Sequence, residues 1–157
     1  YYQTDDALLR AFRAAARHNL VVMVHCENDM LVSAARESLE KAGKTTLAYH
    51  GQARPALAEV EAAHRVLFLA RAAGDPQIYI VHPSVSDTVA EVARAAAQGA
   101  EVLVVTDNSL SELAEKGTIT LYADIDSTFF VHSLVGPIGL VSAVAAAVTL
   151  SAGRARP

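Results

Sequence analysis

The sequence predicts a three-layer α/β protein with a doubly wound parallel sheet of four to five strands. Short apolar runs alternate with longer stretches in which apolar residues recur at helical spacing. Two of the runs, 20–25 and 77–82, end abruptly in His25 and His82. Branched apolar runs bounded by turn signals are typical of strands buried in a parallel sheet. Ligands bind beyond the carboxyl ends of such strands, so we expect both histidines at the functional edge.

The composition indicates one domain and narrows the choice of partners. A chain of 157 residues is long enough to bury a core as a single domain, residues 1–157. Its 13 lysines and arginines are scattered and its net charge is −4, so we expect no nucleic-acid partner. The single cysteine excludes an internal disulfide and indicates a reducing compartment, the cytoplasm.

In the first half, helices are expected on either side of the two histidine-ended strands. The predicted helices cover residues 7–18, about 30–42 and about 56–73. Thr4 or Asp5 can cap the first helix, and Gly43 and Gly74 are typical helix ends. Residues 46–49 could form a short edge strand, which would complete the strand order 2-1-3-4-5.

The second half continues the alternation of helix and strand. We expect a helix at 87–97, capped by Ser86 or Asp87, then strands at 101–106 and 118–123. A short helix at 110–115 would separate these strands. A long apolar helix, about 129–152, would follow them.

The first half also carries a family resemblance. His25-Cys26-Glu27-Asn28, directly after an apolar strand, resembles the His-Ala-Glu-Asn motif of cyclic amidohydrolases of the dihydropyrimidinase and hydantoinase family. Further motifs follow in the family's order and spacing: Gly43-Lys44-Thr45, Tyr49-His50, Arg54-Pro55, Glu59, Glu61 and Ile80-Val81-His82. The resemblance covers about residues 1–84.

This resemblance implies a segment of a (β/α)₈ barrel that holds two metal ions. The family's ligands are a His-x-His pair, a carboxylated lysine, histidines ending strands five and six, and an aspartate. Carried over by position, only His25 and His82 are present, and the sequence has no His-x-His pair. A catalytic zinc typically has three protein ligands. We therefore expect no catalytic residues and no cofactor, apart from weak binding of zinc or another transition metal.

The second half is similar to the sugar-isomerase (SIS) domain of RpiR-type regulators, over about residues 83–150. Three stretches carry the similarity: 83–89, 99–111 and 127–135. The resemblance implies a flavodoxin-like parallel sheet that binds sugar phosphates. Its implied ligand-binding residues lie in two loops: Ser84, Ser86, Thr88, Thr106, Asp107 and Ser109. Glu27, in place of the family's first glycine-rich loop, would oppose a phosphate.

Three functional hypotheses follow, from different classes. The first is a chimeric or engineered scaffold, joined near His82-Pro83 and without evolved catalysis. Parallel βα units share right-handed crossovers, so such a junction is physically reasonable. The second is the remnant of a metal-dependent cyclic-amide hydrolase. The third is a self-associating module that binds a sugar phosphate.

The C-terminal segment predicts self-association. Residues 127–153 carry no Asp, Glu, Lys or Arg and are long enough to span a bilayer, but their many small and hydroxyl residues favour a buried helix. We therefore expect no membrane partner. Val144, Ala147 and Val148 lie on one helical face, and an apolar face left in water is disfavoured. This face predicts a homodimer.

Overall fold

The computed structural model describes residues 2–123, 125, 138–144 and 146–147. The chain divides into two compact units, Tyr1–Glu91 and Val92–Pro157.

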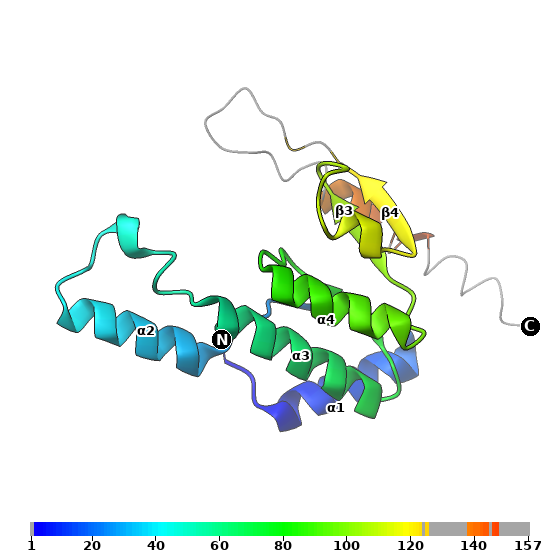
Figure 1. The fold of residues 1–157 in the computed structure, drawn as a ribbon. Helices are drawn as coiled ribbons and strands as arrows, with labels where there is room; N and C mark the ends of the chain where they lie inside the picture. Colours follow the sequence, from blue (N-terminus) through cyan, green and yellow to red (C-terminus); the bar gives the residue numbers. More distant parts are fainter. Residues whose placement is uncertain (1, 124, 126–137, 145, 148–157) are drawn as a thin grey trace, which may run out of the picture. The chain divides into compact units, whose positions relative to one another are not determined.

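The first unit alternates helices with two strands, and Figure 1 shows its helices. Its elements, in chain order, are α1 (Asp5–His18), β1 (Val21–Val24), α2 (Asp29–Lys41), the 3₁₀ helix η1 (Leu47–Tyr49), α3 (Ala56–Ala72) and β2 (Gln77–Ile80). Helix α4 (Ser86–Ala97) begins in this unit.

Local sequence signals explain where these helices begin and end. The Thr4 hydroxyl accepts a hydrogen bond from the Ala7 amide at 3.2 Å and caps α1. Asn28 caps α2 in the same way, because its Oδ1 accepts from the Met30 and Leu31 amides. Gly74, with φ 95°, follows α3 in a conformation that a side chain would disfavour.

The two strands of the first unit pair in parallel and place the site. Val21 pairs with Gln77 and Val24 with Ile80. Alternate residues point to opposite faces of a strand, so Val22 and Val24 pack toward the core while Met23 is 66% exposed. Both strands are shorter than predicted, and the histidines lie just beyond their carboxyl ends.

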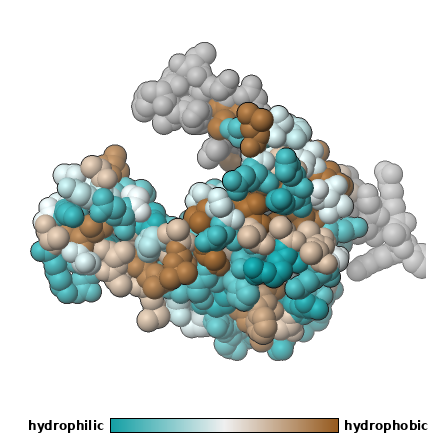
Figure 2. All heavy atoms as spheres, in the orientation of Figure 1, coloured by the Kyte–Doolittle hydropathy of each residue, from teal (hydrophilic) through white to brown (hydrophobic). Residues whose placement is uncertain are grey.

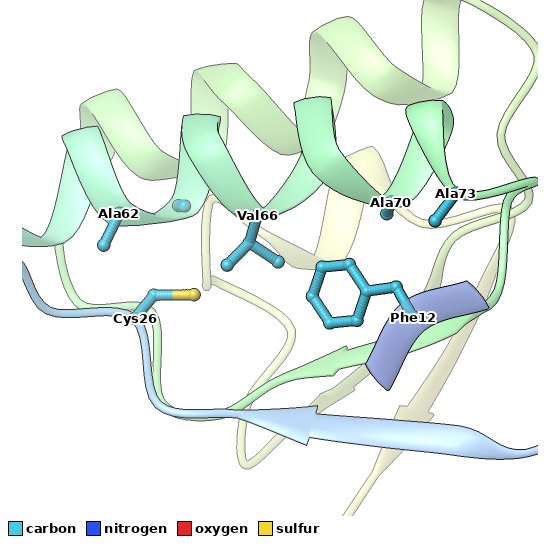
Figure 3. Close-up of a cluster of buried hydrophobic side chains, with 7 residues drawn as sticks. Phe12, Cys26, Ala62, Val66, Ala70 and Ala73 are labelled. Carbon is cyan, nitrogen blue, oxygen red and sulfur yellow. The ribbon is translucent and has the colours of Figure 1, made fainter. Parts of the chain in front are cut away.

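A small core joins α1, α3 and the strands. Its buried residues are Phe12, Cys26, Ala62, Ala63, Val66, Ala70 and Ala73. Phe12 is fully buried, and Figure 3 shows its ring beside Val66 of α3. The alanines of α3 bring the helix close to the strands. Elsewhere, on the face shown in Figure 2, hydrophobic and hydrophilic residues are interspersed.

The second unit contains a further parallel pair. Strand β3 (Leu103–Thr106) pairs with β4 (Ile119–Tyr122), with Leu103 opposite Ile119. The 3₁₀ helix η2 (Ala114–Lys116) lies between them in sequence, and the Thr120 hydroxyl donates to the Ala114 carbonyl at 2.8 Å. Residues 138–144 and 146–147 are helical.

Three local predictions are wrong. Residues 46–49 form no strand: the Tyr49 amide bonds the Thr46 carbonyl at 3.0 Å, so local bonds replace a sheet ladder. The helix predicted at 110–115 is a turn followed by η2, because Leu110 is 92% exposed and the stretch has no buried face. Ser86 is the first residue of α4 rather than its cap, and the Val85 carbonyl accepts the helix's first bond.

The larger architectural predictions are not decided by these elements. The described residues form two two-stranded parallel sheets, order β1-β2 and β3-β4. The single doubly wound sheet stays a prediction. So does the homodimer, because Phe129 and Val148 lie outside the described residues. Within the part of the chain that the structure describes, no helix is both long and apolar enough to cross a membrane.

Candidate functional site

A cavity of about 440 Å³ lies where β1 and β2 end. Histidine, glutamate, arginine and serine side chains line the cavity, together with residues in the segment 50–56, before and at the start of α3. The lining residues are His25, Glu27, His50, Gly51, Arg54, Pro55, Ala56, Glu59, His82, Ser84 and Val85.

The two strand-ending histidines contact each other in this cavity. The Nδ1 atom of His25 lies 2.8 Å from the Nε2 atom of His82, and the ring centroids are 4.7 Å apart. Parallel pairing explains the contact, because Val24 lies opposite Ile80 and the Val81 amide donates to the Val24 carbonyl. His82 has φ 39°, an uncommon left-handed conformation that often marks a functional position.

Glu27 and Arg54 extend the histidine pair on its other side. The Oε2 atom of Glu27 lies 2.7 Å from Nε2 of His25, and the guanidinium of Arg54 donates to the same oxygen. The Glu27 side chain is only 19% exposed. Burial by itself would raise the pKa of Glu27, but the hydrogen bonds from Arg54 and His25 outweigh it and hold this pKa below its usual value.

Glu59 of α3 holds the loop that follows His82. Its carboxylate accepts from the Ser84 amide at 2.9 Å, from the Val85 amide at 3.1 Å and from the Ser84 hydroxyl at 2.5 Å. Burial would raise the pKa of Glu59, but these hydrogen bonds lower it below the usual glutamate value. A carboxylate thus bonds the two residues that directly precede α4, near the helix N-terminus, where negative charge is favourable.

His25 and His82 are close enough to become two ligands of one metal ion. Two nitrogens bound to a tetrahedral zinc at about 2.0–2.1 Å would lie about 3.3 Å apart. The observed 2.8 Å separation is a hydrogen-bond distance, so the two rings would have to move apart by about 0.5 Å to hold one ion. Among the described residues, no group of three or more histidine, cysteine, aspartate or glutamate side chains is arranged to hold a metal. The site therefore offers two imidazoles, which suit zinc, copper or nickel.

The other predicted ligand residues lie in both units. Ser84 lines the cavity, but its amide and hydroxyl are already bonded to Glu59. Ser86 begins α4, and Thr88 is fully buried. Three belong to the second unit: Thr106 ends β3, Asp107 lies within 3.4 Å of its hydroxyl, and Ser109 is exposed.

The sequence alone does not predict that Glu27, Arg54 and Glu59 contribute contacts to this site. All three match the amidohydrolase motifs, and the only role that the sequence suggests is that Glu27 would oppose a phosphate. The position of Glu27 could have been inferred from the sequence. Residues two apart in an extended segment point to the same side, which places Glu27 beside His25. The same alternation buries Cys26, and burial raises the pKa of its thiol to about 12. The Arg54–Glu27 and Glu59–Ser84 contacts join segments that are distant in the sequence, and no local sequence pattern indicates them.

Comparisons with known proteins agree with this geometry. No protein-family model matches the chain. Most of the chain is nevertheless similar to cyclic-amide hydrolases, the class that contains hydantoinases and dihydropyrimidinases. This confirms the amidohydrolase-like segment that the motifs predict.

The individual relatives are D-hydantoinases and their kin. The chain is 39% identical over 102 residues to the D-hydantoinase of Streptomyces coelicolor, covering 65% of this chain and 22% of the relative. It is 37% identical over 102 residues to the allantoinase of Solibacter usitatus.

Solved structures agree as well. The D-hydantoinase of Bacillus sp. AR9 matches with a TM-score of 0.62 and 29% identity, over 67% of this chain and 23% of that one. The dihydropyrimidinase of Brevibacillus agri matches with a TM-score of 0.60, 31% identity and 65% of this chain.

The length of chain that these matches cover bears on the SIS-like and chimera hypotheses. The chain spans less than a quarter of the length of the relatives named above. The matched 102 residues exceed the roughly 84 that the motifs predict. The SIS-like second segment, and the chimera that follows from it, stay predictions.

Proposed function

We propose that the hydantoinase-like part of this chain is the segment of a metal-dependent cyclic-amide hydrolase that supplies two imidazole ligands, His25 and His82. The observation that carries the proposal is the 2.8 Å contact between these histidines at the ends of two paired parallel strands. Identity of 39% to a D-hydantoinase over 102 residues supports the same assignment.

The chemistry of such an enzyme assigns a task to each part of the site. A bound metal ion supplies Lewis acidity and lowers the pKa of a coordinated water. His25 and His82 would hold that ion. Glu59 fixes the backbone that follows His82, and so the position of its ring. The cavity of about 440 Å³ falls in the range of small-molecule sites, and a hydantoin or dihydropyrimidine ring is the substrate class we propose.

Two imidazoles are fewer than the three protein ligands of a typical catalytic zinc. We therefore expect this chain by itself to bind zinc weakly and to leave cyclic amides intact. The missing ligands would come from outside the described residues. This expectation separates the proposal from a scaffold with no metal site, which would bind no zinc at the histidine pair.

Calorimetric titration with zinc tests the proposal. The native chain is expected to bind one zinc weakly, and His25→Ala and His82→Ala are each expected to abolish that binding. His18→Ala is the matched control, because His18 ends α1 outside the cavity. Binding that survives His82→Ala would contradict the proposal, as would the absence of binding by the native chain.

A further inference from the structure

Four side chains of the cavity form a continuous hydrogen-bonded chain. Arg54 donates to Glu27, Glu27 contacts Nε2 of His25 at 2.7 Å, and Nδ1 of His25 contacts Nε2 of His82 at 2.8 Å. At one end of this series Arg54 can only donate and an ionised Glu27 can only accept, whereas each neutral imidazole can do one of each. The order of donors along the chain can therefore be worked out.

The carboxylate decides the direction. An ionised glutamate accepts hydrogen bonds and donates none. Arg54 already donates to Oε2 of Glu27, so the contact of that oxygen with His25 requires a proton on Nε2 of the imidazole. A neutral imidazole carries one N–H and one lone pair. When both imidazoles are neutral, the lone pair of His25 is then on Nδ1, where it can accept from Nε2–H of His82 across the 2.8 Å contact.

We propose that Glu27 is a positioning residue that fixes His25 as the Nε2–H tautomer and so presents the Nδ1 lone pair to the cavity. The role in metal binding rests on the proposed function, whereas the role in setting the tautomer stands on the contacts of Glu27 alone. Carboxylates that hold the second nitrogen of a metal-binding histidine orient the ring and raise its basicity. Arg54 donates to the same Oε2 atom of Glu27 that contacts His25, and this second bond helps to hold the carboxylate beside the imidazole.

The arrangement also specifies what metal binding must displace. The Nδ1 lone pair of His25 faces His82, so a metal ion would take the place of the proton between the two rings. His82 can release that proton from Nε2 and carry one on Nδ1 instead, which leaves the ring neutral. His25 needs no such change, because Glu27 already holds its proton on the far nitrogen.

Nitrogen-15 NMR of the labelled, metal-free chain, recorded where imidazoles are neutral, tests the proposal. Native His25 is expected to show Nε2–H. In Glu27→Gln the side-chain amide can donate as well as accept, so His25 is expected to lose this preference and populate Nδ1–H. Zinc affinity is expected to fall about 10- to 100-fold in the same variant. Glu40→Gln is the matched control, since Glu40 pairs with Arg36 on the surface of α2.

Each result decides between a positioning and a merely structural role. A structural role would change the melting temperature but leave the His25 tautomer as it is. Nδ1–H in the native chain, or an unchanged tautomer in Glu27→Gln, would overturn the proposal. If Glu27→Gln fails to fold, Nδ1–H in the native spectrum would still overturn the proposal. A native chain that shows the Nε2–H tautomer but binds no zinc would refute the proposed function and leave the role of Glu27 in place.

Discussion

Removal of the Glu59 carboxylate should destabilise the first unit substantially. In Glu59→Ala the Ser84 and Val85 amides and the Ser84 hydroxyl all lose their acceptor. The carboxylate, which belongs to another helix, anchors the two residues that directly precede α4. A hydrogen bond to a charged group contributes about 1.5–3 kcal/mol, and water can replace part of the lost bonding at this partly exposed loop. We therefore expect a loss of about 2 kcal/mol in the free energy of unfolding.

The loss should be visible in a melting curve. A change of about 1 kcal/mol shifts the melting temperature of a 60–100-residue domain by about 4–8 °C. Thermal unfolding followed by circular dichroism near pH 7 should therefore show a decrease of roughly 10 °C in Glu59→Ala. Glu40→Ala is the control, because the Glu40 side chain is 59% exposed and forms only a surface ion pair. It is expected to change stability by less than about 0.5 kcal/mol.

The effect of Glu59 must also depend on pH. Its pKa is lower in the folded chain than its ordinary value, so the folded state favours the ionised form. The stabilisation is fully present above the unfolded-state pKa of about 4.3 and is lost as the pH falls through the lower, folded-state value. The difference between the native chain and Glu59→Ala should shrink in acid. A loss under about 0.5 kcal/mol near pH 7, or an equal loss near pH 3, would refute the reasoning.

Other substitutions test the core and the caps. Phe12→Ala should cost about 3–5 kcal/mol in urea unfolding because the ring is fully buried, whereas Phe68→Ala, at a position 68% exposed, should cost little. Asn28→Ala should cost about 1–2 kcal/mol in thermal unfolding because α2 loses its cap, and Thr46→Ala should be nearly neutral because Thr46 makes no capping bond. Cys26 should resist a thiol reagent in native buffer and react once urea unfolds the chain, because it is buried with a pKa of about 12; rapid native labelling would contradict its burial.

The sequence predicted the three helices and two paired strands of the first unit, and it placed both histidines at the carboxyl edge of those strands. Apolar runs that end in histidine determine both strands, and parallel pairing then brings His25 and His82 together. Helix ends could be predicted as well, because threonine favours the N-cap position and glycine favours the positive φ that follows a helix. These features depend on short stretches of chain, which is why they can be read without a structure.

Features that depend on distant segments could not be predicted. The Arg54–Glu27 contact joins residues 27 positions apart, and Glu59 anchors Ser84, which lies 25 positions further along the chain. The strand prediction for residues 46–49 is wrong for a related reason. Their β-forming side chains suggested a strand, but the segment forms local 3₁₀ hydrogen bonds instead. Strand propensity is decided by the partners a strand finds, and the sequence does not show them.

A segment exchange tests the central claim most directly. The stretch of the Streptomyces coelicolor D-hydantoinase that aligns with this chain over 102 residues would be replaced by the corresponding residues of this chain. If this segment supplies two metal ligands of a cyclic-amide hydrolase, the hybrid should open hydantoin in the presence of zinc or manganese. The same hybrid with His25→Ala or His82→Ala should be inactive, while His18→Ala should retain activity. A folded hybrid that binds metal but opens no ring, or one that is indifferent to both histidines, would contradict the account.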